Sequence, residues 1–225
     1  RIVITKEKWF YLDDENQELP LDKSDFSITI DGRTIHFDCV FNAIHGTPGE
    51  DGKIQKYFTD KKIPITGSNS SQSELTFDKV KCLNFLSSKG IKIAPSISLL
   101  KTDKINVSEI ELIVGFPCFI KASNSGSSFG VYKAYDKDQM KNYLDSAFKV
   151  DNKVLVESHI EGKEFSVGVI SFKGDYKVLP ITEIITSNDF FDYDAKYKGK
   201  ADEITPAKIS IELESKLKLL SLKIY

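Results

Sequence analysis

"FIKASNSGSSFGVYKA", residues 119–134, joins two apolar runs through a loop of small polar residues. Lys121 ends the first run, residues 123–128 are all serine, asparagine or glycine, and 129–134 have strand character again. The pattern predicts two strands connected by the loop. Walker-type and dinucleotide-binding glycine loops are followed by a helix, so the second strand excludes both motifs here.

The loop at 123–128 has the composition of an anion-binding segment. Its backbone N–H groups can turn inward around phosphate oxygens, and its serine hydroxyls are further donors. The stretch by itself leaves a flexible hairpin loop open as the alternative.

A second stretch, "FNAIHGTPGEDG" (41–52), places His45 and the acidic pair Glu50-Asp51 among glycines and a proline. Asp51 can cap a helix that begins near Lys53, and the first N–H groups and dipole of that helix favour an anion in the loop. His45 follows a predicted strand, at the edge where α/β proteins usually bind ligands. A capped turn with a histidine satisfied by backbone groups is the alternative.

Two further stretches carry candidate binding residues. In "VLVESHIEGKEFSV" (154–167), Glu157 ends one β-run and Glu164 begins the next. The two carboxylates could bind an amino group and a pair of sugar hydroxyls, or both could equally be solvated turn residues.

The segment 186–203 lacks helix or strand periodicity yet is rich in aromatic residues, unlike a disordered segment. With Lys196, it is predicted to be a lid over a site.

The other runs set the fold class. Asp31-Gly32 within 27–37 predicts a hairpin, 37–44 predicts a buried strand, and 71–90 predicts a helix that stops at Gly90. Interleaved strands and helices predict an α/β (α+β) fold of two or three lobes with a cleft between them. By the same criteria we expect helices at 53–62, 107–115 and 137–150, strands at 93–100, 154–160, 164–172 and 176–184, and joints near 66–73 and 90–95.

Composition limits the classes of partner. The 225 residues hold 31 basic and 33 acidic side chains, a formal net charge of −2, which argues against a general nucleic-acid or membrane-surface binder. The sequence shows no membrane-spanning run and no signal peptide. Cys39, Cys82 and Cys118 are interpreted as small buried hydrophobes in a reducing compartment. An anionic ligand would therefore be held by locally placed lysines.

Taken together and in this order, the motifs resemble those of the D-alanine–D-alanine ligases of the ATP-grasp superfamily. The resemblance covers about 37–209 and implies an ATP-grasp fold, multi-lobed with mixed sheets and incomplete at both ends. The implied lobes are a substrate lobe (1–75), a central lobe (76–165) and the start of a C-terminal lobe (166–225). The matching motifs are the substrate motif at 45–52, a "TGS…DK" segment at 66–79, the serine loop at 119–130, the nucleotide hinge at 154–165 and the ω-loop at 188–197.

The resemblance implies a role for each matching residue. Lys196 would reach the γ-phosphate when the lid closes, and Tyr197 would tie the lid to Ser127, so these three are the predicted catalytic residues. His45 and Glu50 would bind the first D-alanine. ATP would be bound by Lys79 and Lys121 at the phosphates, Ser127 and Ser128 covering them, Glu157, Ser158 and Ile160 at the adenine hinge, and Glu164 on the ribose.

The sequence also departs from the family pattern. Ala122 replaces the usual proline after the lysine, and Phe129 stands where valine is common. The family's N-terminal glycine-rich loop and its C-terminal arginine and Mg²⁺ (or Mn²⁺) ligands do not appear within the 225 residues, so metal ligands are expected after Tyr225. We expect that these residues alone would not catalyse ligation, whereas the complete protein would.

The implied activity is ATP-dependent formation of D-alanyl-D-alanine for peptidoglycan, in the cytoplasm, by a homodimer. Two alternatives remain. A D-alanine–D-lactate ligase of the same superfamily is disfavoured by Lys196-Tyr197, which resemble the dipeptide-forming enzymes. A nucleotide-binding module without catalysis is supported only by the missing ends.

Overall fold

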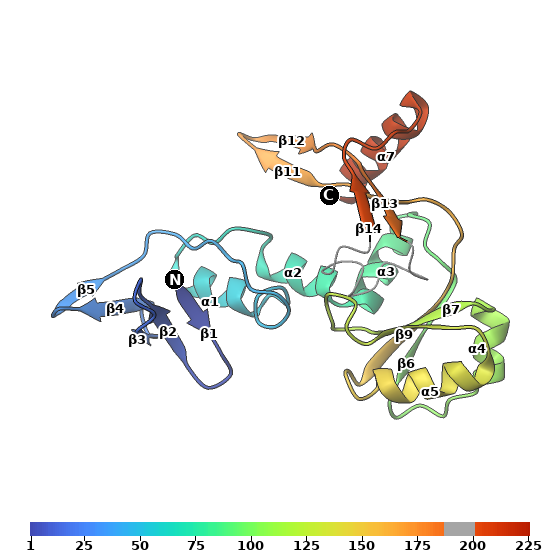
Figure 1. Ribbon diagram of the computed structural model, residues 1–225, viewed down its shortest axis with the longest axis horizontal. Helices are drawn as coiled ribbons and strands as arrows, with labels where there is room; N and C mark the ends of the chain where they lie inside the picture. The colour runs from blue at the N-terminus through green and yellow to red at the C-terminus, as the bar shows by residue number, and fades with distance from the viewer. Residues whose placement is uncertain (187–200) are drawn as a thin grey trace. The chain divides into compact units, whose positions relative to one another are not determined.

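The computed structural model describes residues 1–186 and 201–225, and these fall into two compact units, Arg1–Phe77 and Asp78–Tyr225 (Figure 1). The unit boundary lies between the helices α2 (Ser70–Phe77) and α3 (Lys79–Ser88). The division of the chain into three lobes stays a prediction.

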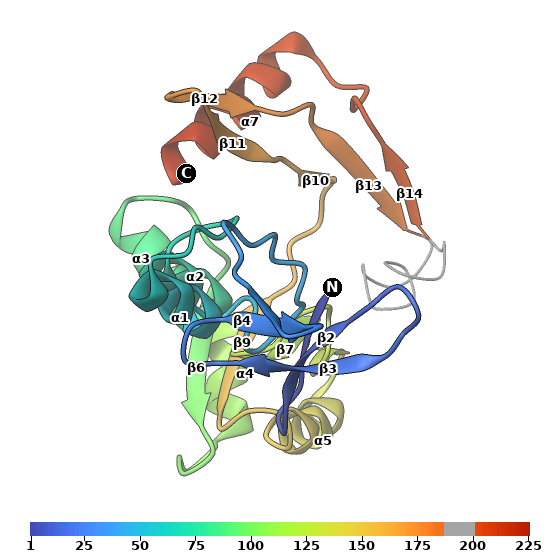
Figure 2. The ribbon, with the colours of Figure 1, turned by 90° about the vertical axis from the view of Figure 1, so that its left-hand side faces the viewer.

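The first unit is built on a five-stranded antiparallel meander (Figure 2). Asp31 and Gly32 both have positive φ, 51° and 74°, as a two-residue hairpin turn that follows strand twist requires. The hairpin predicted for 27–37 is therefore confirmed. The strands are β1 (Ile2–Ile4), β2 (Trp9–Leu12), β3 (Glu18–Asp22), β4 (Ser27–Ile30) and β5 (Arg33–Ile35).

Helix α1 (Lys53–Lys61) closes the core of this unit. Ile54 and Phe58, one helical turn apart, pack on apolar residues of the sheet region. The rings of Phe26 and Phe58 meet edge to face with centroids 4.6 Å apart, an arrangement that aromatic pairs prefer. The predicted helix at 53–62 is confirmed to within one residue.

The apolar run at 37–44 was predicted to be a buried strand, and that prediction is wrong. Val40 forms a single parallel bridge with Ile65, and Phe41 is 80% exposed. The Asn42 side chain accepts from the N–H of Ile44 and donates to the carbonyl of Gly49, so the chain turns into a loop instead of extending a ladder.

The single helix predicted within 71–90 is two helices. Asp78 has extended φ and ψ, −83° and 104°, and caps α3 by accepting from the N–H of Lys81. A cap inside a run of continuous helical spacing ends one helix and begins the next. The predicted stop at Gly90 is confirmed, since α3 ends at Ser88 and Gly90 has a φ of 72°.

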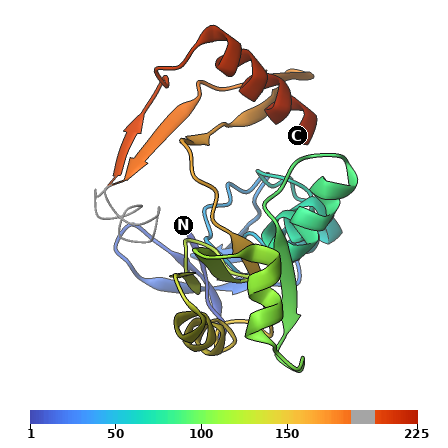
Figure 3. The same cartoon turned by 90° about the vertical axis from the view of Figure 1, so that its right-hand side faces the viewer.

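The second unit begins with a four-stranded antiparallel sheet in the order β6-β9-β7-β8. Helices α4 and α5 contact each other and the strands, and Figure 3 shows them together beside the sheet. The elements are β6 (Ser96–Leu100), α4 (Val107–Val114), β7 (Cys118–Ala122), β8 (Val131–Ala134), α5 (Lys137–Ala147) and β9 (Lys153–Ser158). The strand–loop–strand prediction for 119–134 is confirmed.

Strand alternation gives this sheet two chemically different faces. Ile120 and Val156, which pair across β7 and β9, belong to the buried core that α4 and α5 cover. Their neighbours in sequence, Lys121 and Glu157, point to the opposite face because successive side chains of a strand alternate. One face thus holds the lobe together and the other carries charge.

The described chain from Glu164 onward forms a three-stranded antiparallel sheet, in the order β10-β13-β14, and a separate antiparallel pair of β11 with β12. The runs predicted at 164–172 and 176–184 are each interrupted, so each contributes two strands. The elements are β10 (Glu164–Ser166), β11 (Val169–Phe172), β12 (Asp175–Val178), β13 (Thr182–Thr186), β14 (Ala201–Ile204) and α7 (Ile211–Ile224). No helix among the described residues is long and apolar enough to cross a membrane.

The cysteines differ in burial. Cys118 is buried, and burial raises the pKa of its thiol to about 11, as expected of an inert core residue. Cys82 is half-buried and Cys39 is exposed. The prediction that all three are buried is therefore wrong, because Cys39 lies in the segment that does not form a strand.

We predict that Gly130→Ala destabilises the protein more than Gly90→Ala. Both glycines have left-handed φ, 70° and 72°, so alanine costs about 1–2 kcal/mol at either position. At Gly130 a new Cβ would also lie 3.0 Å from Cβ of Ala122 and 3.3 Å from the side chain of Val150, whereas Gly90 is open. Crowding should add about 1–3 kcal/mol, measured as the free energy of unfolding in denaturant. Equal losses would contradict this.

Candidate functional site

The charged face of the four-stranded sheet carries an ion pair between neighbouring strands. Lys121 of β7 is paired in register with Leu155 of β9, and Glu157 lies two residues further along β9 on the same face. Nζ of Lys121 and Oε1 of Glu157 form an ion pair, with side chains 24% and 16% exposed. The structure therefore brings together two residues that the family resemblance assigns to the phosphates and to the adenine hinge.

The serine loop leaves β7 beside this pair. Ser127 and Ser128 both have left-handed φ, 51° and 60°. Each such conformation costs a non-glycine residue about 1–3 kcal/mol and is concentrated at ligand-binding sites. The turn is tightened where Phe129 donates its N–H to Gly126 at 2.9 Å, and Oγ of Ser125 donates to the carbonyl of Phe129. The predicted loop is thus a tight turn of defined shape.

Lys79 reaches this loop from the first turn of α3. Its Nζ donates to three carbonyls, those of Ala122 at 3.1 Å, Ser123 at 3.4 Å and Ser125 at 2.6 Å. Burial, with the nearby positive charge of Lys121, lowers the pKa of Lys79 from 10.5 to about 8. Between about pH 8 and pH 10.5 the unfolded chain binds the proton that the folded chain has released, so this lysine adds stability as the pH rises.

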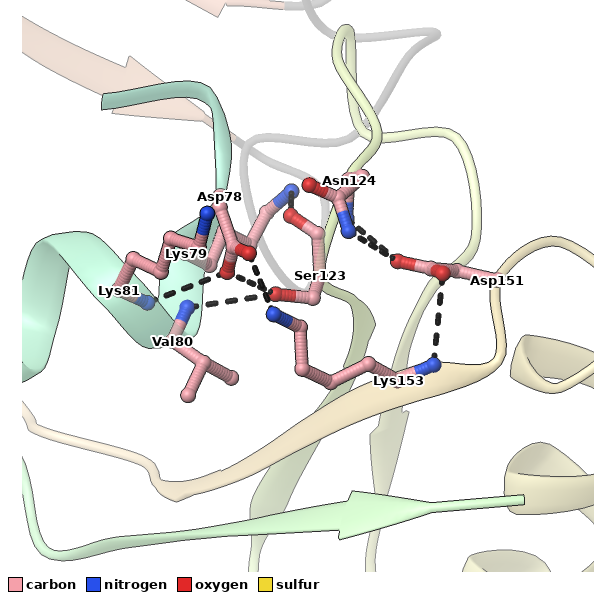
Figure 4. A network of polar contacts seen from close by, with 8 residues as sticks. All are labelled: Asp78, Lys79, Val80, Lys81, Ser123, Asn124, Asp151 and Lys153. Carbon is pink, nitrogen blue, oxygen red and sulfur yellow. Dashed lines mark hydrogen bonds and ion pairs between the residues drawn. The ribbon is translucent and has the colours of Figure 1, made fainter. Parts of the chain in front are cut away.

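Sequence reasoning missed the buried carboxylate next to Lys79. Asp78 lies between the first turn of α3, Ser123 and the Lys153 side chain (Figure 4). Burial opposes its ionisation, but hydrogen bonds from Lys153, Ser123 and Lys81 outweigh burial and lower its pKa. The available signal was an Asp before a lysine-rich helical run, the composition of an N-cap.

The 41–52 loop in the first unit is ordered by its own acidic residues. Gly46 donates its N–H to the Glu50 carboxylate at 2.6 Å, and Thr47 donates its hydroxyl to Asp51 at 2.9 Å. The N-cap of α1 is Gly52 rather than the predicted Asp51, whose carboxylate accepts from the N–H of Lys53 at 3.2 Å. His45 and Glu50 are both exposed.

The surroundings of residue 49 explain why this loop needs a glycine there. Its carbonyl accepts from the side-chain amides of Asn42 and Gln55, at 2.8 and 2.7 Å. A Cβ at Gly49 would lie 2.3 Å from the carbonyl oxygen of Ile44, which no side chain can tolerate. Close backbone approach therefore fixes the glycine and holds the loop on α1.

The remaining predicted residues are placed as follows. Ser158 lies on the core side of β9, where its hydroxyl donates to the carbonyl of Val114 at 2.7 Å. Ile160, in the segment after β9, is 66% exposed, and Glu164 is the exposed first residue of β10. The predicted contacts of these three with a nucleotide stay predictions, as do those of His45 and Glu50 with an amino acid. Lys196 and Tyr197 lie outside the described residues.

The donor set fits a polyphosphate better than a metal ion. Two lysine ammonium groups and a sharply turned serine loop lie together in the second unit, and cations with loop donors are the usual partners of phosphate oxygens. Among residues 1–186 and 201–225, no three His, Cys, Asp or Glu side chains gather in a way that could hold a metal ion.

The matching family model and two similar relatives of this chain belong to one family. The family model described as "D-ala D-ala ligase C-terminus" matches residues 85–225. A D-alanine–D-alanine ligase of Flavobacterium johnsoniae is 52% identical over 96% of this chain and 67% of its own length. That of Christiangramia forsetii is 46% identical over 100% of this chain and 69% of its own length. The chain thus spans about two thirds of these relatives.

Solved structures agree with the fold. The VanG D-Ala:D-Ser ligase from Enterococcus faecalis superimposes with a TM-score of 0.81 and 30% identity, over 100% of this chain and 71% of its own. The D-alanine–D-alanine ligase from Bacillus anthracis complexed with ATP has a TM-score of 0.70 and 31% identity, over 84% of this chain and 59% of its own.

We predict that acylation of Lys79 by an amine-reactive reagent rises with a midpoint near pH 8, because only the neutral amine reacts. Peptide mass spectrometry across a pH series would measure this midpoint. In a Lys121→Ala variant the midpoint should move upward, since a neighbouring positive charge is removed. A wild-type midpoint at about 10.4, the ordinary lysine value, would contradict the assignment.

Proposed function

The chain belongs to the D-alanine–D-alanine ligase family of ATP-grasp enzymes, and we propose that its protein joins two D-alanines at the expense of ATP. The observation that carries the proposal is the meeting of Lys79, Lys121 and the serine loop at the charged face of one sheet. Such an arrangement suits the triphosphate of a nucleotide, which concentrates negative charge in a small volume.

The proposed roles follow from charge and position. ATP, when bound, supplies the phosphoryl group that activates the carboxylate of the first D-alanine, and the amine of the second then displaces phosphate. Lys79 and Lys121 would hold phosphate oxygens and offset the charge that develops during transfer. The backbone and hydroxyls of Ser127 and Ser128 would cover the phosphates and exclude water.

The other assignments come from the family pattern and complete the proposal. Glu157 and the exposed Ile160 would border the adenine, with Ser158 beside them, and Glu164 would bind the ribose hydroxyls. His45 and Glu50 would bind the first D-alanine. No step is assigned to Mg²⁺, because the described residues offer no cluster of ligands for it.

The product would supply the D-alanyl-D-alanine terminus of peptidoglycan precursors. We propose a cytoplasmic homodimer, since family members commonly act as dimers in that compartment. The likeness to a D-Ala:D-Ser ligase adds D-serine to D-lactate as a second substrate to compare with D-alanine.

The full-length protein should release phosphate from ATP when D-alanine is the sole amino acid, with the dipeptide as product. Release would be measured with Mg²⁺ and D-alanine alone, with added D-lactate or D-serine, and with L-alanine in place of D-alanine. Mixed products with D-lactate or D-serine would reassign the second substrate. No D-alanine-dependent release from a folded, ATP-binding chain would favour the nucleotide-binding module.

A Lys121→Ala variant should lower D-alanine-dependent phosphate release roughly a hundredfold, as loss of one group that stabilises transition-state charge does. Lys137→Ala is the matched control, because Lys137 is also ion-paired, to Glu111 at 2.7 Å, but on the helical side of the same lobe. An exposed pair contributes little, so the control should stay near wild-type activity. An equal loss of phosphate release in the two variants would contradict the assignment of Lys121 to the phosphates.

A further inference from the structure

We propose that Asp78 is a positioning residue for nucleotide binding, which fixes Lys79 and the start of the serine loop relative to each other. The inference rests on the proposed function, because it concerns the same phosphate site. It does not require Asp78 to touch the nucleotide: the carboxylate acts through the residues that it holds.

The carboxylate receives donors from three separate segments (Figure 4). Oδ1 accepts from the N–H of Lys81 in α3 at 3.1 Å and from Oγ of Ser123 at 2.7 Å, and Oδ2 is ion-paired with Lys153 of β9. Ser123 is 45 residues away in sequence and Lys153 is 75 residues away. The side chain of Asp78 is only 5% exposed, so water competes little for these contacts.

Ser123 transmits this anchoring to the loop. Its hydroxyl donates to Asp78 and accepts from the N–H of Val80, and its carbonyl accepts from the N–H of Lys79 at 3.1 Å. Its own N–H donates to the carbonyl of Lys153 at 2.9 Å. Ser123 is fully buried, so the first residue of the loop is held by α3 on one side and β9 on the other.

The next residue is anchored from the opposite side. Asn124 donates both its N–H and its side-chain amide to Asp151, at 2.7 and 2.8 Å, and Asp151 also accepts from the N–H of Lys153. The backbone that offers its carbonyls to Lys79 therefore begins between two carboxylates. Loss of the contacts of Asp78 would release the start of the loop from α3 and would move the Lys79 ammonium relative to those carbonyls.

Among the described residues of this unit, the side chains that cap the other helices, Asn106, Asp136 and Ser210, bond to backbone N–H groups only two or three residues away. Asp136 caps α5 through the N–H of Gln139 at 2.8 Å, three residues along the chain. Asp78 performs the same local task and adds two long-range partners, one of them charged. A role in helix capping alone would not call for those partners, and this difference makes Asp136 the matched control.

The test measures ATP binding and steady-state kinetics in the full-length protein carrying Asp78→Ala, Asp78→Asn or Asp136→Ala. Asp78→Ala should raise the Kd and KM for ATP roughly ten- to hundredfold, as a misplaced binding group does, and leave the KM for D-alanine little changed. Asp136→Ala should cost stability and leave ATP binding at the wild-type level.

Asp78→Asn keeps the test decisive if the alanine variant fails to fold. Its Oδ1 can still accept from Lys81 and Ser123, but its amide would face the Lys153 ammonium. The variant therefore removes the link to β9 alone, and ATP binding should weaken while the helix is retained. The double variant Asp78→Asn/Lys153→Met removes the unpaired charge and should recover thermal stability without recovering ATP affinity.

Wild-type ATP affinity in a folded Asp78→Asn variant, or equal weakening by Asp136→Ala, would overturn the inference, as would recovery of ATP affinity in the double variant. The proposed function fails separately. If the wild-type protein shows no D-alanine-dependent phosphate release but Asp78 variants still weaken ATP binding, the ligase activity is wrong and the positioning role stands. If the wild-type protein does show D-alanine-dependent phosphate release but the Asp78 variants bind ATP normally, the ligase activity stands and the positioning role of Asp78 is wrong.

Discussion

Asp78 places a nearly inaccessible carboxylate where the starts of a helix, a strand and a loop converge. Burying a carboxylate and an ammonium together gives little net stability over apolar packing, yet removing one partner of a buried pair typically costs about 3–5 kcal/mol. The contact with Lys153 is therefore better understood as a geometric constraint than as a source of stability. Asp78 also accepts from Ser123, and this contact fixes the position of the first residue of the serine loop. The position of the phosphate site depends on that residue.

The sheet beneath the site makes this constraint effective. Ile120 and Val156 are fully buried against α4 and α5, so the strands that carry Lys121 and Glu157 cannot shift without disturbing the core. Strand alternation then places the charged pair on the opposite face at a fixed spacing. Packing on one face thus limits the freedom of the ionic groups on the other, as a binding site on a rigid element requires.

Local signals in the sequence predict much of this arrangement. Asp31-Gly32 specifies its hairpin because both residues tolerate positive φ, and the loop at 123–128 marks its own boundaries by composition. The signal failed at 37–44, where Asn42 diverts the backbone with its side chain, and at Asp78, where helical spacing continues across a cap. The contacts of Asp78 join positions 45 and 75 residues apart, and no local pattern encodes which distant lysine or serine will meet a buried carboxylate.

The same contacts bear on how a phosphate would be received. All three donors of the Lys79 ammonium can be engaged by backbone carbonyls at the end of β7 and in the serine loop, and Lys121 is ion-paired with Glu157. A phosphate oxygen would replace one of these acceptors. The net free energy gained is therefore the difference between a hydrogen bond to a charged acceptor and the bond that it replaces. An ammonium with a pKa near 8 has lost hydration already, and an anion would restore its preference for the charged form. Partial burial of Lys79 therefore favours a strong response to negative charge, provided that the loop holds its carbonyls where Asp78 and Ser123 place them.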